Sequence, residues 1–174
     1  MFIINDIYTI FNELLTEIDN KDIIIVNNIK FKEILSRKYI INLDNYIDID
    51  IFLNKEIKYD LENDLIERDR LFEMINNNFI LFENDLYTRQ FVFQPKYIDN
   101  KNLASCLSLF QFIVRDNKLY MYIFVRSQNL LNNFIFDNQT YILLYFNCLE
   151  RLQKYNIKKA YIDVSITSLH KNVI

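Results

Sequence analysis

Three residues with reactive or charged side chains stand at the two ends of one predicted β-hairpin. Cys106 precedes the first strand, and Arg126 and Ser127 follow the second. A cysteine attacks carbon only as a thiolate, and a neighbouring guanidinium lowers the pKa of a thiol, so this pairing suits nucleophilic catalysis. The guanidinium and the hydroxyl could together bind a phosphate. On residue types alone, a core hairpin with a buried cysteine and an exposed arginine is the commoner arrangement.

The elements that must position these residues are indicated by hydrophobic patterning. Apolar residues alternate over 110–114, Asp116-Asn117 supplies a tight turn, and an apolar run returns over 119–125. Alternating helices and strands elsewhere predict an α/β (α+β) chain, which at 174 residues we expect to be a single domain, 1–174. The predicted helices span 5–18 (capped by Asn5 or Asp6), 46–61, 67–79 and 141–155, and the other predicted strands span 22–26, 29–31, 91–93 and 160–166.

The segment that begins at Cys106 resembles the thymidylate synthase and deoxycytidylate (dCMP) hydroxymethylase family. The matching positions follow the family's spacing without a gap: Cys106, Phe110-Gln111-Phe112, Arg126-Ser127, and Phe136-Asp137 with Tyr141. The resemblance implies a thymidylate synthase-like fold, with helices packed on a mixed twisted sheet that has a central β-hairpin. It also implies a homodimer in which two such sheets pack back to back.

The resemblance implies a pyrimidine C5 one-carbon transfer. Cys106 would attack C6 of the base, and C5 would then accept a one-carbon unit from 5,10-methylenetetrahydrofolate. Asp48 would relay protons as a general acid/base, although a small shift of the alignment would give this role to Asp50. Both aspartates are also typical of solvated helix positions.

The resemblance further implies how a nucleoside monophosphate would be bound. Its phosphate would contact Arg126, Ser127 and the partner subunit's Arg89, its sugar His170, and its base Asp137 and Gln111. Thymidylate synthases have an asparagine at the base-reading position, which both donates to O4 and accepts from N3-H of uracil. An ionised aspartate only accepts, so Asp137 favours the C4 amino group of cytosine and hence a cytidylate ligand.

Several positions depart from the family pattern, and they leave a second function open. Ser105 and Leu107 stand where the family has proline and histidine beside the cysteine. Asn129 stands in place of a folate-holding aspartate, Asn133 in place of a glycine, and Gln90 in place of one of two arginines. Ser168-Leu169-His170 stands in place of a His-x-Tyr motif. A glycine-rich phosphate loop and a long folate-site insertion have no counterpart. The alternative is therefore a catalytically inactive relative that acts as a nucleotide-binding or protein-interaction module.

Composition excludes several other classes of function. The chain has no glycine, which phosphate-binding P-loops and dinucleotide fingerprints both require. Its net charge of -3 provides no basic surface for nucleic acid. Cys106, Cys148 and His170 lack the paired spacing of a zinc site, and a Ser-His-Asp triad would depend on His170, near the chain end where fraying is common.

Composition also suggests where the protein works. Two cysteines, no secretory signal and no apolar run of about 18 residues predict a soluble cytoplasmic protein that does not enter a membrane. The absence of glycine and tryptophan beside many asparagine, isoleucine and lysine residues indicates an AT-rich coding sequence, as in some viruses, phages or parasites. For a viral protein the compartment would be the host cytoplasm.

Overall fold

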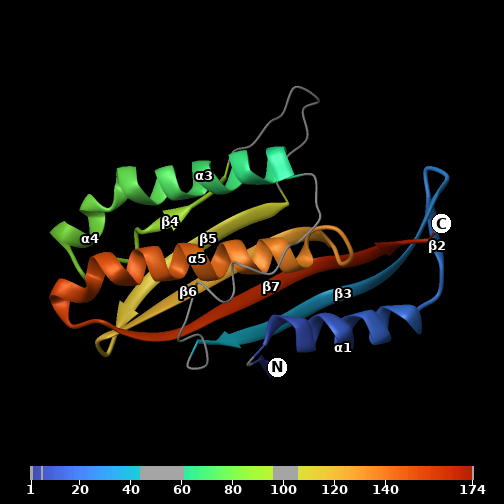
Figure 1. Ribbon diagram of the computed structural model, residues 1–174, viewed down its shortest axis with the longest axis horizontal. Helices are drawn as coiled ribbons and strands as arrows, with labels where there is room; N and C mark the ends of the chain where they lie inside the picture. The colour runs from blue at the N-terminus through green and yellow to red at the C-terminus, as the bar shows by residue number, and fades with distance from the viewer. Residues whose placement is uncertain (1, 5, 44–60, 96–105, 174) are drawn as a thin grey trace.

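The computed structural model describes residues 2–4, 6–43, 61–95 and 106–173, and the strands in these ranges form one mixed sheet (Figure 1). The order across the sheet is β1-β3-β7-β6-β5-β4, and β2 forms a hairpin with β3. The β1–β3 and β6–β7 pairs are parallel, and the other pairs are antiparallel. The strands are β1 (Phe2–Ile4), β2 (Ile24–Val26), β3 (Ile29–Asn42), β4 (Val92–Phe93), β5 (Leu107–Arg115), β6 (Lys118–Asn129) and β7 (Lys158–Asn172).

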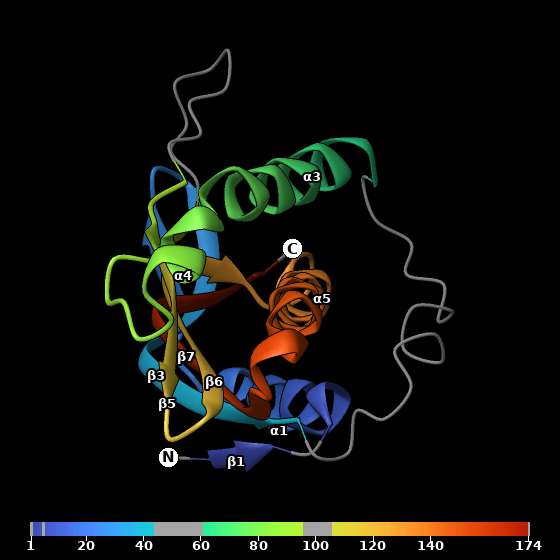
Figure 2. The ribbon, with the colours of Figure 1, turned by 90° about the vertical axis from the view of Figure 1, so that its left-hand side faces the viewer.

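The long helices lie on one face of this sheet. Figure 2 shows α1, α5 and α3 side by side on the same side of the strands, with α5 in the middle. The helices are α1 (Ile7–Asp19), α3 (Leu61–Asn78), α4 (Ile80–Asn84) and α5 (Phe134–Leu152), and a short 3-10 turn, Gln153–Tyr155, follows the last. Among the described residues, none of these helices is both long and apolar enough to cross a membrane.

Helix α1 forms where the sequence predicts it. Ile7, Ile10, Leu14 and Ile18 recur at helical spacing and are all buried. The side chain of Asp6, one of the two predicted caps, accepts a hydrogen bond of 3.2 Å from the backbone N–H of Tyr8. The predicted amphipathic helix and its cap are therefore confirmed.

Two buried hydroxyl groups fix α5 to the sheet. The Tyr145 hydroxyl donates to the carbonyl oxygen of Leu119 on β6 at 2.6 Å and accepts from the N–H of Ala160 on β7 at 2.7 Å. The Tyr39 hydroxyl on β3 donates to Asn138 Oδ1 at 2.8 Å. Since buried polar groups must find partners, these bonds allow one register between the helix and the strands beneath it. They hold α5 in place at Asn138 in its first half and at Tyr145 in its second.

The hairpin of β5 and β6 is confirmed, but four other elements are longer than the sequence predicts. β3 was predicted only over 29–31, β7 over 160–166, α3 only from 67 and α5 only from 141. In the extra parts of β3 and β7, buried and exposed residues do not alternate strictly, so these parts carry no regular period-2 apolar pattern. In α5 the first turns contain buried Asn138, Gln139 and Thr140, which disguise the helical period. The predicted helix 46–61 lies almost entirely outside the described residues.

Tight corners in this chain are made without glycine. Among the described residues, the non-glycine positions with positive φ are Asn27, Asn28, Ser36, Asp116, Asn117 and Asn156. Asparagine and aspartate are the residue types that tolerate this left-handed conformation best after glycine. The β2–β3 and β5–β6 hairpins both turn through such pairs, as expected for two-residue hairpin loops.

Candidate functional site

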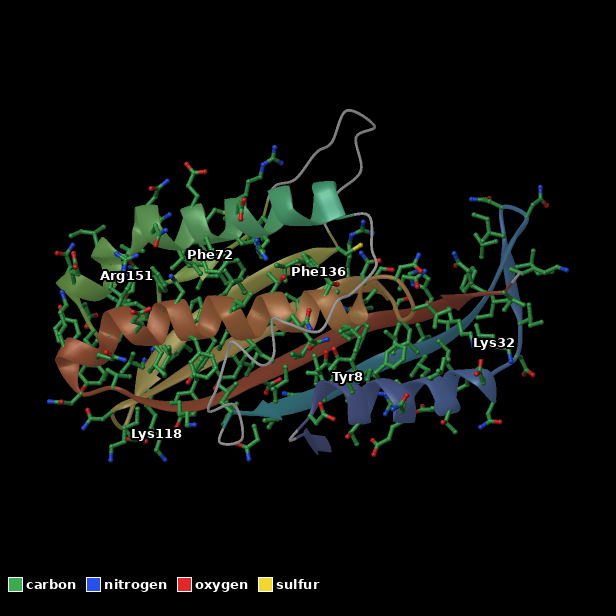
Figure 3. The ribbon with its side chains drawn as sticks, in the orientation of Figure 1. Tyr8, Lys32, Phe72, Lys118, Phe136 and Arg151 are labelled. Atoms are coloured by element: carbon green, nitrogen blue, oxygen red, sulfur yellow. The ribbon has the colours of Figure 1, made fainter. Side chains whose placement is uncertain are left out.

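A cavity of about 310 Å³ lies where β5 begins, β6 ends and α5 begins. One side of α3 and the far part of β7 complete its wall, and Phe136, labelled in Figure 3, belongs to the α5 part of it. Its volume and its mixture of apolar and convergent polar groups are typical of a small-ligand site. The lining residues are Arg68, Leu71, Cys106, Leu107, Ser127, Gln128, Asn129, Asn133, Phe136, Asp137, Thr140, Tyr141 and His170.

The carboxylate of Asp137 lies in the first turn of α5, with its backbone N–H bonded to the carbonyl oxygen of Asn133 at 2.8 Å. The positive end of a helix dipole stabilises a negative charge at this position. The side-chain amide of Gln128 on β6 also donates from Nε2 to Asp137 Oδ2, at 2.7 Å. Both interactions place positive partial charge beside the carboxylate, whose remaining lone pairs can accept hydrogen bonds from a ligand.

The thiol of Cys106 is exposed at the beginning of β5 and lines the same cavity. The N–H of Arg126 donates to the Cys106 carbonyl oxygen at 2.9 Å, which fixes the backbone next to the thiol. The second cysteine, Cys148, is buried in α5, and this burial raises the pKa of its thiol well above the ordinary value. Of the two thiols, Cys106 is the one that a ligand in the cavity can reach.

His170 lies within the sheet and is not frayed. β7 pairs it with Glu33 on β3 and with Asn129 on β6, and its carbonyl oxygen accepts from Leu130 N–H at 2.8 Å. The Nδ1 atom of its ring is 3.4 Å from Ser127 Oγ. Burial lowers the pKa of His170 below its ordinary 6.5, and the Glu33 carboxylate partly opposes this shift. The imidazole is therefore neutral at pH 7 and can exchange hydrogen bonds with a hydroxyl.

Comparison with solved structures identifies this architecture. Thermostable thymidylate synthase A from Bacillus subtilis matches with a TM-score of 0.67, over 95% of this chain and 79% of that chain. The chain has a thymidylate synthase-like fold. The sequence identity is 12%, so the likeness shows the fold alone. No protein-family model and no curated protein matches the sequence.

The thymidylate synthase-like fold brings together several of the residues predicted from the sequence. Cys106, Ser127, Asp137 and His170 come from four different elements, or from the segment just before one, and all line the cavity. Asn129, which replaces a folate-holding aspartate, also lines it. The Oδ1 atom of Asn129 accepts from the N–H groups of Leu131 and Asn132 at 3.0 and 3.1 Å, which shapes the turn into α5. Their roles toward a ligand remain predictions.

Other predicted site residues lie elsewhere. Arg126 is exposed and is not among the residues that line the cavity. Gln111 donates from Nε2 to the carbonyl oxygen of Arg89 at 2.9 Å, and neither residue belongs to the lining. Asp48 lies outside the described residues. Within the described ranges, no group of three or more His, Cys, Asp or Glu side chains is arranged to hold a metal ion.

Four lining residues were not predicted from the sequence, and two of them, Arg68 and Gln128, carry a charge or an amide that bears on the chemistry of the site. Arg68 belongs to the helix predicted over 67–79 and was given no role in the site, yet its side chain is only 29% exposed and lies at the cavity. Gln128 directly follows the Arg126-Ser127 pair, at the point where the strand was predicted to have ended. Gln128 could have been predicted only if the strand had been extended to Asn129, and the polar residues after position 125 hide that extension in the sequence.

Proposed function

We propose that this cavity binds a pyrimidine nucleoside monophosphate, preferably cytidylate, and that Cys106 adds to C6 of the base as the first step of a C5 one-carbon transfer. The observation that supports this most strongly is that the Cys106 thiol and the Asp137 carboxylate line one cavity of nucleotide size in a thymidylate synthase-like fold. One group is a nucleophile and the other is an acceptor for the C4 amino group. Arg68 adds positive charge for the phosphate.

The chemistry of the base requires a thiolate. When sulfur adds to C6, the electron pair of the C5–C6 double bond moves toward C5, which becomes nucleophilic. C5 can then take a proton from water; loss of the original C5 hydrogen as a proton returns the electron pair and expels the thiolate. The net result without a carbon donor is exchange of the C5 hydrogen with water. His170 and Ser127 would hold the sugar beside this centre.

The carbon donor proposed for the transfer is 5,10-methylenetetrahydrofolate, which supplies a one-carbon unit at the oxidation level of formaldehyde. A volume of about 310 Å³ is at the lower end of the range for ligand pockets and suits one nucleotide. The described cavity therefore does not fit a nucleotide and a folate together. The residues at the site support nucleotide binding and addition of the thiol at C6.

The proposal includes a homodimer that forms through the uncovered face of the sheet. In Figure 2 the helices lie on the opposite face. Phe124 is 47% exposed on the uncovered side, and the rings of Tyr120 and Tyr161 pack edge to face there at 5.0 Å. A second copy would cover these aromatic residues. It would also supply the partner subunit's Arg89 toward the phosphate.

Thermal unfolding with dCMP, CMP, dUMP or no ligand tests the binding step. A ligand at about a hundred times its Kd adds roughly 2.7 kcal/mol of stability, which raises the midpoint by about 5 to 10 °C for a chain of this size. We expect this shift with a cytidylate in the wild type. Asp137→Asn should lose it and gain a shift with dUMP. The matched control is Asp116→Asn in the exposed β5–β6 turn, which should behave as the wild type.

Release of tritium from C5-labelled dCMP into water tests the chemical step. The wild type should release it and Cys106→Ala should not, although this variant should still show the thermal shift. Binding without release in the wild type would favour the alternative, a nucleotide-binding module without catalysis. No shift with any nucleotide would contradict the proposal and leave a protein-interaction role.

A further inference from the structure

We propose that Gln128 is a positioning residue that sets the base selectivity of the cavity by holding the Asp137 carboxylate. This inference rests on the proposed function, because selectivity has meaning only if a pyrimidine nucleotide binds. It concerns a residue that was not predicted from the sequence. Gln128 contacts Asp137, its amide is buried, and the amide oxygen has no hydrogen-bond partner among the described residues.

The contact joins two elements that meet at the cavity. Gln128 is on β6 and Asp137 is on the first turn of α5, and Gln128 Nε2 donates to Asp137 Oδ2 at 2.7 Å. A hydrogen bond to an ionised acceptor is stronger than one between neutral groups, and this length is typical of such a bond. The amide therefore orients the carboxylate plane as well as stabilising its charge.

The amide itself has no freedom to turn away. Gln128 is 1% exposed, so its side chain is enclosed by the strand, the helix and the cavity wall. A glutamine amide can be placed either way round, but only one orientation points the NH₂ group at a carboxylate, which has nothing to donate. The donor and acceptor ends of Gln128 are thus assigned by the charge of Asp137.

The third observation is that the other end of the amide is left unsatisfied. Gln128 Oε1 is buried and has no hydrogen-bond partner among the described residues. A buried acceptor without a partner is unfavourable, and native structures contain few of them. The orientation of this amide is therefore one that serves Asp137 at the expense of its own hydrogen bonding, which is typical of a group retained for a functional reason.

Base selectivity follows from the hydrogen-bond acceptors that the oriented carboxylate presents to the ligand. While Gln128 donates to Oδ2, the Asp137 carboxylate is held in one orientation and presents acceptors only, so a base with an amino group at C4 is bound and a base with a carbonyl oxygen there is repelled. If the donor is removed, the carboxylate can rotate away from the base. A carboxylate that is no longer held beside C4 would not distinguish the amino group of cytosine from the oxygen of uracil, and the discrimination would fall.

Two variants of nearly the same size separate positioning from simple packing. Gln128→Met keeps the volume but removes the donor, and we expect the ratio of dUMP Kd to dCMP Kd to fall at least tenfold. Gln128→Glu places a second carboxyl group against Asp137, so the pair would share one proton and bind dUMP better as the pH falls from about 8 to about 6. The control is Gln139→Met. Gln139 is buried like Gln128, but it lies in α5 and does not line the cavity, so this variant should keep the wild-type ratio.

Calorimetric titration of the three variants and the wild type with dCMP and dUMP gives the ratios. A wild type that selects dCMP, together with a Gln128→Met protein that selects it equally well, would overturn this inference and leave the proposed function intact. If Gln128→Met does not fold, an unchanged and pH-independent ratio in Gln128→Glu would overturn it in the same way. A wild type that binds neither nucleotide would remove the proposed function and this inference with it.

Discussion

A single histidine makes the ionisation of this cavity directly measurable. His170 is the only histidine in the chain, and its ring nitrogen faces the Ser127 hydroxyl at 3.4 Å. Burial is the larger influence on its pKa, and the Glu33 carboxylate is the smaller, opposing one. The neutral form is favoured because the half-buried ring loses hydration that the charged form needs.

We expect an NMR titration of the His170 ring protons in the folded protein to give a midpoint below the ordinary 6.5. Because the folded pKa is lower than the unfolded one, the unfolded chain binds more protons between these two values. This contribution to stability is fully present above pH 6.5 and is lost as the pH falls toward the folded pKa. Glu33→Gln should lower the midpoint further, and a midpoint at or above 6.5 in the wild type would contradict the assignment.

At the scale of elements, the β2–β3 hairpin is the part of the described structure least covered by its surroundings. It extends beyond the helical layer at one end of the molecule (Figure 1), and every residue from 21 to 30 is exposed. Its large aliphatic residues are 40% to 62% exposed: Ile23, Ile24, Ile25, Val26 and Ile29. A short, apolar, weakly charged edge strand is a site for unwanted pairing between chains.

Ile25→Lys should reduce self-association through this hairpin without changing the fold. Ile25 is 62% exposed, so the substitution should alter the free energy of unfolding by no more than about 0.5 kcal/mol. Light scattering during slow heating should show later or weaker aggregation, while the unfolding midpoint stays the same. Asn12→Lys adds an equal charge at an exposed position of α1 and controls for net charge. Equal protection by both variants would show that the hairpin is not the cause.

The elements also show how far sequence alone could lead. The β5–β6 hairpin and α1 were predictable because their apolar period is regular and their cap or turn residues are explicit. The start of α5 was not, because buried Asn138 is satisfied by Tyr39, which is distant in sequence, and by its own helix through Phe134. The residues of the site differ in the same way. Cys106 and Asp137 could be predicted because they belong to a recognisable sequence pattern. The contact of Gln128 with Asp137 could not, because it exists only when β6 and α5 pack together.

At the scale of the whole molecule, the two faces of the sheet differ in character. One face is covered by α1, α3 and α5, and the other carries side chains such as Phe124 and Tyr161 with an ion pair of 3.0 Å between Lys38 and Asp163. A hollow of about 400 Å³ lies beside Phe124, with Ser165 in its wall. Partly apolar surface of this kind, next to a hollow, suits the proposed contact between two copies.

Phe124→Glu should weaken such a dimer. The ring is 47% exposed in one chain, so its loss should change the stability of the isolated fold little, whereas a glutamate buried at the contact would lose its hydration. Sedimentation velocity should show a dimer for the wild type and a monomer for the variant at equal concentration. Tyr87→Glu, at a side chain that is also exposed (51%), is the control and should remain dimeric. A wild type that is monomeric at all concentrations would contradict the predicted assembly.

The left-handed corners made by asparagine, aspartate and serine have a consequence for the unfolded chain. A glycine in place of Asn156 or Asn117 would relieve the native backbone, but it would also be freer than asparagine once the protein unfolds. Where the native backbone angles allow alanine, replacing a glycine by alanine stabilises a protein by about 0.4–1 kcal/mol, chiefly because the unfolded chain has fewer conformations. A chain with no glycine therefore starts from a narrower unfolded ensemble. Its corners are less relaxed than glycine corners, and the denatured state from which they form is correspondingly less disordered.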